Sequence, residues 1–523
     1  MSWSFKKAVD AWHCCRISLL KESLFYGLSL NRSGNIFDVN KFITDPWAGN
    51  LKVGRAILDC SFVVDGDTEP LNILDTVTGA NRKNVWYVTG FQWIRDLQAV
   101  GGNSSRKYVR HVVSAFINSY RKAGKFWLEN ESWDSEVVGE RIVNWILLYP
   151  FFAAGANDKF QRTVLSSLAE HFSHLQKCYK AETDPYPRLI ALKALIYCYC
   201  SMKTDQHRKV GRSAHEMYEI IGECIDEVGM FKGGSPADHF HIFRSLLETR
   251  FVVKNSVADT LDSKFVVMIS MMAHITRFFR MCDGGISNHH GAAVHSRVSF
   301  MPDRHIIDTA LSVVEIGSYA DTPTGFCKLE TKKSAVIINT KARTARSQFN
   351  HPSEPGINIF DLEASFGSNR VLHRSDMSVL YNGLRTRIDE GARTFTKKST
   401  QRDVLLFEGE VQFPNRFFDF AMRREVELAI SGQRLGCTDF VLSSIRMDAW
   451  IRFVFTAAVR MREINKKSIL LSIGASEYMF TFVHDDTNIV TSESRTAYPT
   501  IEIGLPINAG HPIELNWSIE CLK

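Results

Sequence analysis

The chain has 523 residues, of which 45% are hydrophobic and 23% are charged. It is too long for one ordinary domain core, and its composition is that of a folded protein rather than of a disordered or low-complexity one. Lysine and arginine exceed aspartate and glutamate by 63 − 57 = 6, and no run of like charges concentrates this excess, so the sequence does not favour a dedicated nucleic-acid-binding protein.

The amino-terminal segment does not resemble an export signal, because it lacks a continuous apolar stretch followed by a small-residue cleavage site. Its Trp3, Phe5, Val9 and Trp12 can form one apolar face of a helix, which predicts packing onto the protein rather than docking on a membrane surface. No segment reaches the ~18 to 20 apolar residues that span a bilayer.

The 11 cysteines show no CxxC pair and no regular spacing. This pattern is typical of reduced thiols and not of a disulfide framework. With the missing export signal, it predicts a cytoplasmic location, with the periplasm as the alternative.

Between about residues 85 and 280, apolar residues recur every three or four positions, as in amphipathic helices. Short breaks with Gly, Asp, Asn or Pro separate the segments, as in helical hairpins. The predicted helices lie within residues 85–100, 106–124, 135–155, 160–180, 188–202, 212–231, 238–253 and 263–281.

Past residue 325 the apolar period changes to two, which indicates antiparallel strands. The predicted strands lie within residues 333–340, 358–366, 424–431, 450–459, 468–474, 478–484, 500–507 and 513–520. Helices first and strands second argue for two architectures and against an alternating α/β fold. Periodicity alone leaves a bundle, a solenoid or a toroid open for the helices, although no fixed-length repeat favours a solenoid.

Several short segments, taken in order, resemble the heparinase II/III family of polysaccharide lyases. They are GRAILDCSF (54–62), FQWIRDL (91–97), RIVNWI (141–146), FKGG (231–234), RFFR (277–280) before Asp283-Gly284, EVEL (425–428) and NWSI (516–519). The resemblance implies an α+β chain: an amino-terminal incomplete (α/α) toroid of helical hairpins, followed by an antiparallel β-sandwich, with a substrate groove between them. The expected domains are an extension over 1–50, the toroid over 51–310 and the β-sandwich over 311–523.

The resemblance also implies β-elimination in an acidic, uronate-containing or amino-sugar polysaccharide, with no cofactor. This reaction needs a group that neutralises the carboxylate, a base, and an acid for the leaving oxygen. The family's Asn-His pair falls on Tyr186-Pro187 in this chain, and the family's tyrosine falls near Ile242. Those losses leave open a catalytically degenerate scaffold that binds glycan or protein.

His351 is the first catalytic candidate, because the loop over residues 349–356 resembles the β-domain loop from which these lyases point a histidine at the groove. An exposed loop imidazole without a task is the alternative. In the segment DHFHIF (238–243), His239 and His241 point about 200° apart on a helix, so both cannot face the groove. We expect His239 to face it as an assisting group, because it lies nearer the helix amino terminus; a structural helix start is the alternative.

Asn144, with Arg95 or Arg141, is expected to hold the carboxylate, while Trp93 and Trp145 offer surfaces on which a sugar can stack. The alternatives are a hydrogen-bonded asparagine in a helical core and ordinary aromatic packing.

Two further chemistries stay open. Asp96, Asp134, Glu136 and Glu140 could supply the paired carboxylates of a glycoside hydrolase. His289 and His290 could bind a metal with His295 or His305, although no acid or thiol sits at a familiar ligand spacing. We predict no metal site.

Overall fold

The structure is a computed structural model, and the residues that it describes make up most of the chain. They are residues 26, 29–30, 33–63, 70–79, 84–122, 131–232, 235–256, 263–287, 289, 304–314, 323, 325–340, 343–345, 356–358, 360–381, 384–385, 393–414, 419–483, 488–492 and 498–522. Two compact units form: one from residues 1–234, 238–273 and 293–317, and one from residues 235–237, 274–292 and 318–523.

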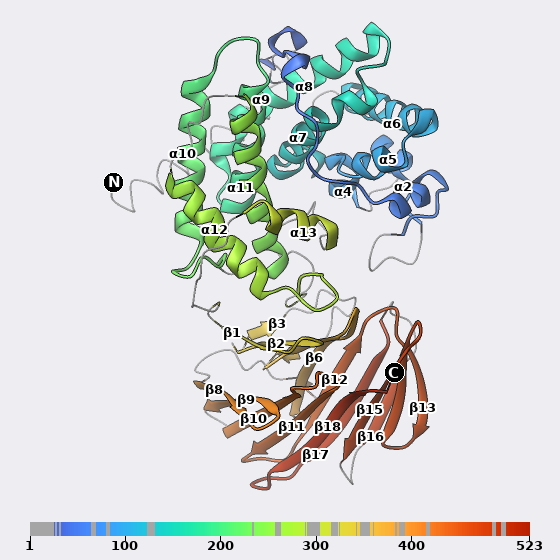
Figure 1. Ribbon diagram of the computed structural model, residues 1–523, viewed down its shortest axis with the longest axis vertical. Helices are drawn as coiled ribbons and strands as arrows, with labels where there is room; N and C mark the ends of the chain where they lie inside the picture. Colours follow the sequence, from blue (N-terminus) through green and yellow to red (C-terminus); the bar gives the residue numbers. More distant parts are fainter. Residues whose placement is uncertain are drawn as a thin grey trace. The chain divides into compact units, whose positions relative to one another are not determined.

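The first unit is helical and forms an incomplete (α/α) toroid (Figure 1). Its long helices pack on one another, as α7 does on α9 and α9 on α10. The α-helices are α2 (Leu51–Leu58), α3 (Ile73–Thr78), α4 (Val85–Gly90), α5 (Ile94–Val100), α6 (Gly102–Lys122), α7 (Ser135–Phe152), α8 (Asp158–Cys178), α9 (Pro185–Cys200), α10 (His207–Cys224), α11 (Pro236–Ser256), α12 (Ser263–Phe278, whose last turn belongs to the second unit) and α13 (Arg304–Ser312). The short 3-10 turns are η2 (Gly34–Ile36), η3 (Val39–Lys41), η5 (Glu131–Trp133) and η6 (Tyr179–Ala181).

Helix α7 lies in the core of the helical unit, since nearly all of its side chains are buried. Two glycines permit close helix contacts. A Cβ at Gly54 of α2 would lie 2.2 Å from the carbonyl oxygen of Asp96 in α5, and a Cβ at Gly139 of α7 would lie 3.0 Å from that of Ile190 in α9. The glycine that opens the GRAILDCSF segment therefore lets α2 pack against the FQWIRDL segment.

The second unit contains two antiparallel sheets. The first has the order β1-β2-β5-β6-β12-β17-β16, with β4 and β7 also paired to β6 and β3 paired to β4. Its strands are β1 (Phe326–Glu330), β2 (Ser334–Asn339), β3 (Arg343–Ala345), β4 (Gly356–Asn358), β5 (Leu362–Phe366), β6 (Asn369–Tyr381), β7 (Leu384–Arg385), β12 (Met447–Phe455), β16 (Asn488–Ser492) and β17 (Thr500–Ile507). The second sheet has the order β13-β14-β15-β18-β11-β10-β9-β8. Its strands are β8 (Arg393–Gln401), β9 (Val404–Pro414), β10 (Asp419–Ala429), β11 (Arg434–Ser443), β13 (Arg460–Asn465), β14 (Ser468–Ile473), β15 (Ser476–Val483) and β18 (Ile513–Cys521).

Both sheets contribute to one hydrophobic core, which makes the unit a β-sandwich. Val336 and Phe453 of the first sheet belong to the same buried cluster as Val426 and Trp517 of the second. Burial alternates along β10, β11 and β12 as the period of two predicted. The predicted order of helices followed by antiparallel strands is thus confirmed. None of the described helices combines the length and the apolarity that a bilayer crossing requires.

Candidate functional site

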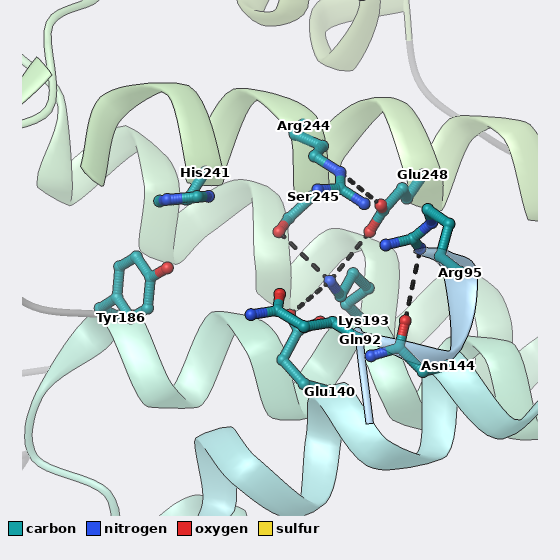
Figure 2. Close-up of a pocket in the computed structure, with 10 residues that line it drawn as sticks. All are labelled: Gln92, Arg95, Glu140, Asn144, Tyr186, Lys193, His241, Arg244, Ser245 and Glu248. Atoms are coloured by element: carbon teal, nitrogen blue, oxygen red, sulfur yellow. Dashed lines mark hydrogen bonds and ion pairs between the residues drawn. The ribbon is translucent and has the colours of Figure 1, made fainter. Parts of the chain in front are cut away.

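A polar pocket lies inside the helical unit, where α5, α7, α9 and α11 meet. Its free space is about 10 Å³, which is room for about one water molecule. Figure 2 shows the lining side chains, which are Gln92, Arg95, Glu140, Asn144, Tyr186, Lys193, His241, Arg244, Ser245 and Glu248.

Helical spacing brings these side chains to one place. Glu140 and Asn144 are four apart on α7, and His241, Ser245 and Glu248 are four and three apart on α11, so each set occupies one helix face. Helix α9 begins at Pro185, and the carboxylate of Asp184 accepts the backbone N–H of Tyr186 at 2.9 Å. This cap fixes Tyr186 in the first turn of the helix.

Lys193 is the centre of the pocket's charge cluster. Its ammonium donates to Glu140 Oε1 at 2.8 Å and to Glu248 Oε2 at 2.9 Å, with Ser245 Oγ at 3.5 Å (Figure 2). Glu248 Oε1 also accepts from Arg244 Nε at 2.9 Å and from Trp47 Nε1 at 2.7 Å. Burial alone would lower the pKa of Lys193, but Glu140 and Glu248 outweigh it and raise that pKa. Lys193 is therefore charged and paired.

Glu248 is a buried carboxylate held in its ionised form. Burial would raise its pKa, but Lys193 and then Arg244 outweigh burial and lower the pKa from 4.5 to about 2. A carboxyl group with a depressed pKa is ionised over the whole neutral range, so Glu248 cannot act there as a general acid.

This shift predicts a pH dependence of stability. Because the folded-state pKa lies below the unfolded value, the contribution of Glu248 is complete above the unfolded pKa of 4.5 and is lost as the pH falls toward about 2. Between about pH 7 and about pH 3, we expect the wild-type unfolding free energy to fall by about 2 kcal/mol more than that of Glu248→Gln. Urea unfolding at both pH values measures this difference, and equal losses in the two proteins would contradict it.

Arg95 and Asn144 occupy the side of the pocket next to α5. Arg95 Nε is ion-paired with Asp45, and a terminal nitrogen of Arg95 lies 3.4 Å from Asn144 Oδ1. The amide nitrogen of Asn144 donates to the carbonyl oxygen of Gly90 at 2.9 Å. Burial would lower the pKa of Arg95, but Asp45 outweighs it and raises that pKa. Asn144 and Arg95, two of the residues predicted to hold a substrate carboxylate, thus lie next to each other in the pocket lining.

Tyr186 and His241 lie at one end of the pocket in Figure 2, away from the Arg95–Asn144 pair. Both side chains are buried. A phenol and an imidazole are groups that can donate or accept a proton in catalysis. Neither residue was among the predicted site residues, although the divergence of His239 and His241 on the helix already required one of the two histidines to face elsewhere.

Three of the predicted substrate-binding residues lie in the core instead of the pocket. Trp93 and Trp145 are fully buried, and Trp93 Nε1 donates to the carbonyl oxygen of Val88 at 2.9 Å. Arg141 is also fully buried; it donates to the carbonyl oxygens of Thr89 and Ser132 at 2.9 Å each, and its guanidinium lies 4.7 Å from the ring centre of Phe116. None of these three side chains lines the pocket. Trp93, Trp145 and Arg141 therefore pack in the core, which was the alternative to binding a sugar.

His239 does not line this pocket, whereas His241 does. The ring of His239 is fully buried, with Nε2 2.9 Å from the carbonyl oxygen of Met272 and Nδ1 3.4 Å from the backbone nitrogen of Phe231. Burial lowers its pKa to about 4, against the opposing effect of the Met272 carbonyl. Both ring nitrogens of His239 thus contact backbone groups, which indicates a structural role for this side chain.

His351, His290 and His295 lie outside the described residues. The catalytic role of His351 therefore stays a prediction. His289 is buried in the β-sandwich unit, with Nε2 2.9 Å from the carbonyl oxygen of Ile337 and Nδ1 3.5 Å from Asp361. His305 Nε2 lies 2.7 Å from the carbonyl oxygen of Ala48. Within the part of the chain that the structure describes, no three His, Cys, Asp or Glu side chains are grouped so that they could hold a metal ion.

The carboxylates of the hydrolase alternative do not converge on this pocket. Of Asp96, Asp134, Glu136 and Glu140, the described pocket lining includes Glu140 alone. Asp96 instead accepts the backbone N–H of Asn50 at 2.8 Å. The second carboxylate of the pocket is Glu248, and it shares the ammonium of Lys193 with Glu140.

The fold is similar to that of solved polysaccharide lyases. A crystal structure of heparinase III matches 95% of this chain with 88% of its own, at 12% identity and a TM-score of 0.59. A second heparinase III structure, with methylated lysines, matches 96% of this chain with 88% of its own, at 11% identity and a TM-score of 0.51. A mutant of the heparan sulfate lyase HepC from Pedobacter heparinus matches 92% of this chain with 93% of its own, at 11% identity and a TM-score of 0.49.

No protein-family model and no curated protein matches the sequence. At 11% to 12% identity, the likeness to the heparinase III structures concerns the arrangement of the backbone. It confirms the architecture that the short motifs implied: this chain has the fold of heparinase III, an incomplete (α/α) toroid followed by an antiparallel β-sandwich.

Proposed function

We propose that the protein cleaves an acidic, uronate-containing polysaccharide by β-elimination in the pocket between α5, α7, α9 and α11. One observation carries the proposal: Tyr186 and His241 line the same pocket as the Arg95–Asn144 pair, in a chain with the fold of heparinase III. The proposed lyase activity also agrees with the activity for which the heparinase III structures are named.

The four side chains match the needs of the reaction. Arg95 and Asn144 would bind the substrate carboxylate, which stabilises the negative charge that develops when the neighbouring proton leaves. Tyr186 or His241 would take that proton, and the other would donate a proton to the leaving glycosidic oxygen. A carbon–carbon double bond forms as the carbon–oxygen bond breaks, so no water is consumed. His351 is a further candidate for one of the two proton transfers.

The test is the formation of an unsaturated uronate product, followed by its ultraviolet absorbance with a panel of uronate polymers. We expect Tyr186→Phe and His241→Ala each to lower kcat/KM at least about 100-fold, because general acid–base groups contribute at least that much. Tyr199→Phe on the same helix and His215→Ala on α10 are matched controls, since both residues lie outside the pocket lining. Full activity in both pocket variants would contradict the proposal.

A second candidate function is glycan binding without cleavage on the same scaffold. The ion pairs favour it: Asp45 binds Arg95, and Glu140 and Glu248 bind Lys193. With about 10 Å³ of free space, a sugar could enter only if these pairs separate. Measurable binding of a uronate polymer with no product from any polymer would favour this candidate. New reducing ends without the unsaturated product would favour a hydrolase.

A further inference from the structure

A second and larger cavity lies in the β-sandwich unit, at the end where two edge strands approach each other. Its volume is about 690 Å³, within the range of about 300 to 1,000 Å³ that is usual for ligand sites. Its walls come mainly from β1, which is an edge strand of the first sheet, and from β8 and β9, of which β8 is an edge strand of the second (Figure 1). Nothing in the proposed reaction uses it.

The lining of this cavity is electropositive. The described residues that line it include three lysines, Lys328, Lys397 and Lys398, and one acid, Glu330. Lys328 Nζ is paired with Glu330 at 2.8 Å, whereas Lys398 Nζ donates to the neutral carbonyl oxygen of Lys328 at 2.6 Å. Lys397 Nζ lies 3.8 Å from Glu408, and its side chain is 70% exposed. At such exposure, an ion pair contributes little. Lys397 and Lys398 are neighbours on β8 and point to opposite faces of the strand, so Lys398, whose ammonium donates to a neutral oxygen, is the lysine of β8 that is placed to bind an anion in the cavity.

Hydroxyl and aromatic groups surround these charges. Strand geometry places Thr396, Lys398 and Thr400 on the same face of β8, because alternate residues share a face. Thr340, Phe326 and Phe278 also line the cavity. The mixture of threonine hydroxyls, phenylalanine rings and lysines suits a ligand that carries hydroxyls and an apolar ring face as well as negative groups.

We propose that this cavity binds a segment of an acidic oligosaccharide through the carboxylate or sulfate groups on its sugars. The lysines supply point charges for those groups, and the threonines supply hydrogen bonds to sugar hydroxyls. The site does not depend on cleavage in the helical pocket. It would bind the polysaccharide whether or not the polysaccharide is cut.

The test uses the full chain and a probe that contains no uronate and so cannot undergo the proposed elimination: short dextran sulfate. Neutral dextran of equal length and polyglutamate are the comparison ligands. Cys327 lines the cavity and is half-buried, whereas Cys521 is half-buried outside it in the same unit. Because burial raises the pKa of the Cys327 thiol, alkylation is followed by mass spectrometry at mildly alkaline pH. We expect dextran sulfate to slow alkylation of Cys327 at least about tenfold and to leave Cys521 unchanged.

The double variant Lys397→Gln/Lys398→Gln should weaken dextran sulfate binding at least about tenfold, because charge-assisted contacts are among the stronger polar ones. Lys466→Gln/Lys467→Gln on the turn after β13 removes the same charge away from the cavity, and it should bind as the wild type does. Both double variants are checked for folding by circular dichroism and thermal unfolding.

Equal protection of Cys327 by neutral dextran, or equal affinity of the two double variants, would overturn the proposal. Protection by polyglutamate without protection by dextran sulfate would also overturn it, in favour of an acidic peptide. The outcome is separate from that of the lyase assay, because Lys397 and Lys398 lie outside the pocket of Tyr186 and His241.

Discussion

Replacing Arg424 with methionine is expected to lower the free energy of unfolding of the β-sandwich unit by about 3 to 5 kcal/mol, because it removes one member of a buried ion pair. Arg424 on β10 is fully buried, and its guanidinium binds both carboxylate oxygens of Asp439, at 2.5 and 3.0 Å. One terminal nitrogen also donates to the carbonyl oxygen of Phe360 and to Ser375 Oγ, at 2.9 Å each. The variant would leave Asp439 charged and unpaired in an apolar core.

Denaturant unfolding measures this loss, and Arg452→Met is the matched control. Arg452 on β12 pairs with Glu502 at 2.5 Å, but both side chains are 29% exposed, so we expect a loss below about 1 kcal/mol. The double variant Arg424→Met/Asp439→Asn removes the unpaired charge and keeps an oxygen that can accept from Trp517 Nε1, which now donates to Asp439 at 3.0 Å. It should be more stable than Arg424→Met. Similar losses for Arg424→Met and Arg452→Met would contradict the argument.

The order of helices and strands was predictable from the sequence because the apolar period differs between the two parts of the chain. The segment over residues 424–431 alternates in the sequence, and β10 alternates between buried and more exposed side chains accordingly. The register and the order of the strands were not predictable, since they depend on pairing between distant segments, such as β12 with β6 and β17. The short family-like motifs supplied the choice of a toroid, which periodicity alone left open.

The pocket was only partly predictable because its helices are buried on nearly every face. Helices α7 and α9 show almost no polar side, so the sequence of α7 does not tell a polar pocket residue such as Asn144 from a polar core residue such as Arg141. Helical geometry did predict that His239 and His241 diverge. The carbonyl oxygen of Met272, which holds His239, comes from α12, and no local pattern reveals such a contact.

Replacing Lys193 with methionine should lower the free energy of unfolding of the helical unit by about 3 to 5 kcal/mol near neutral pH. The ammonium has a side-chain exposure of 2%, and it lies within 2.9 Å of Glu140 and Glu248. Without it, the carboxylates of Glu140 and Glu248 line one small pocket with no ammonium between them, and their mutual repulsion destabilises the folded state. Protonation would then relieve the repulsion, so the loss should shrink as the pH falls toward about 4, whereas the wild type gains nothing from acid there.

Urea unfolding at several pH values tests this expectation, with Arg188→Met on the same helix as the control. Arg188 pairs with Glu216 at 2.7 Å, but the two side chains are 22% and 24% exposed, so the control should lose less than about 1 kcal/mol at every pH. Adding Glu140→Gln to Lys193→Met should restore part of the stability at neutral pH, because one of the facing charges is removed. A loss in Lys193→Met that matched the control and did not vary with pH would show that the three charges are not coupled. In that case a sugar could enter the pocket without separating a strong network of ion pairs. The pairing of Lys193 with Glu140 and Glu248 would then no longer favour a binding scaffold over a lyase.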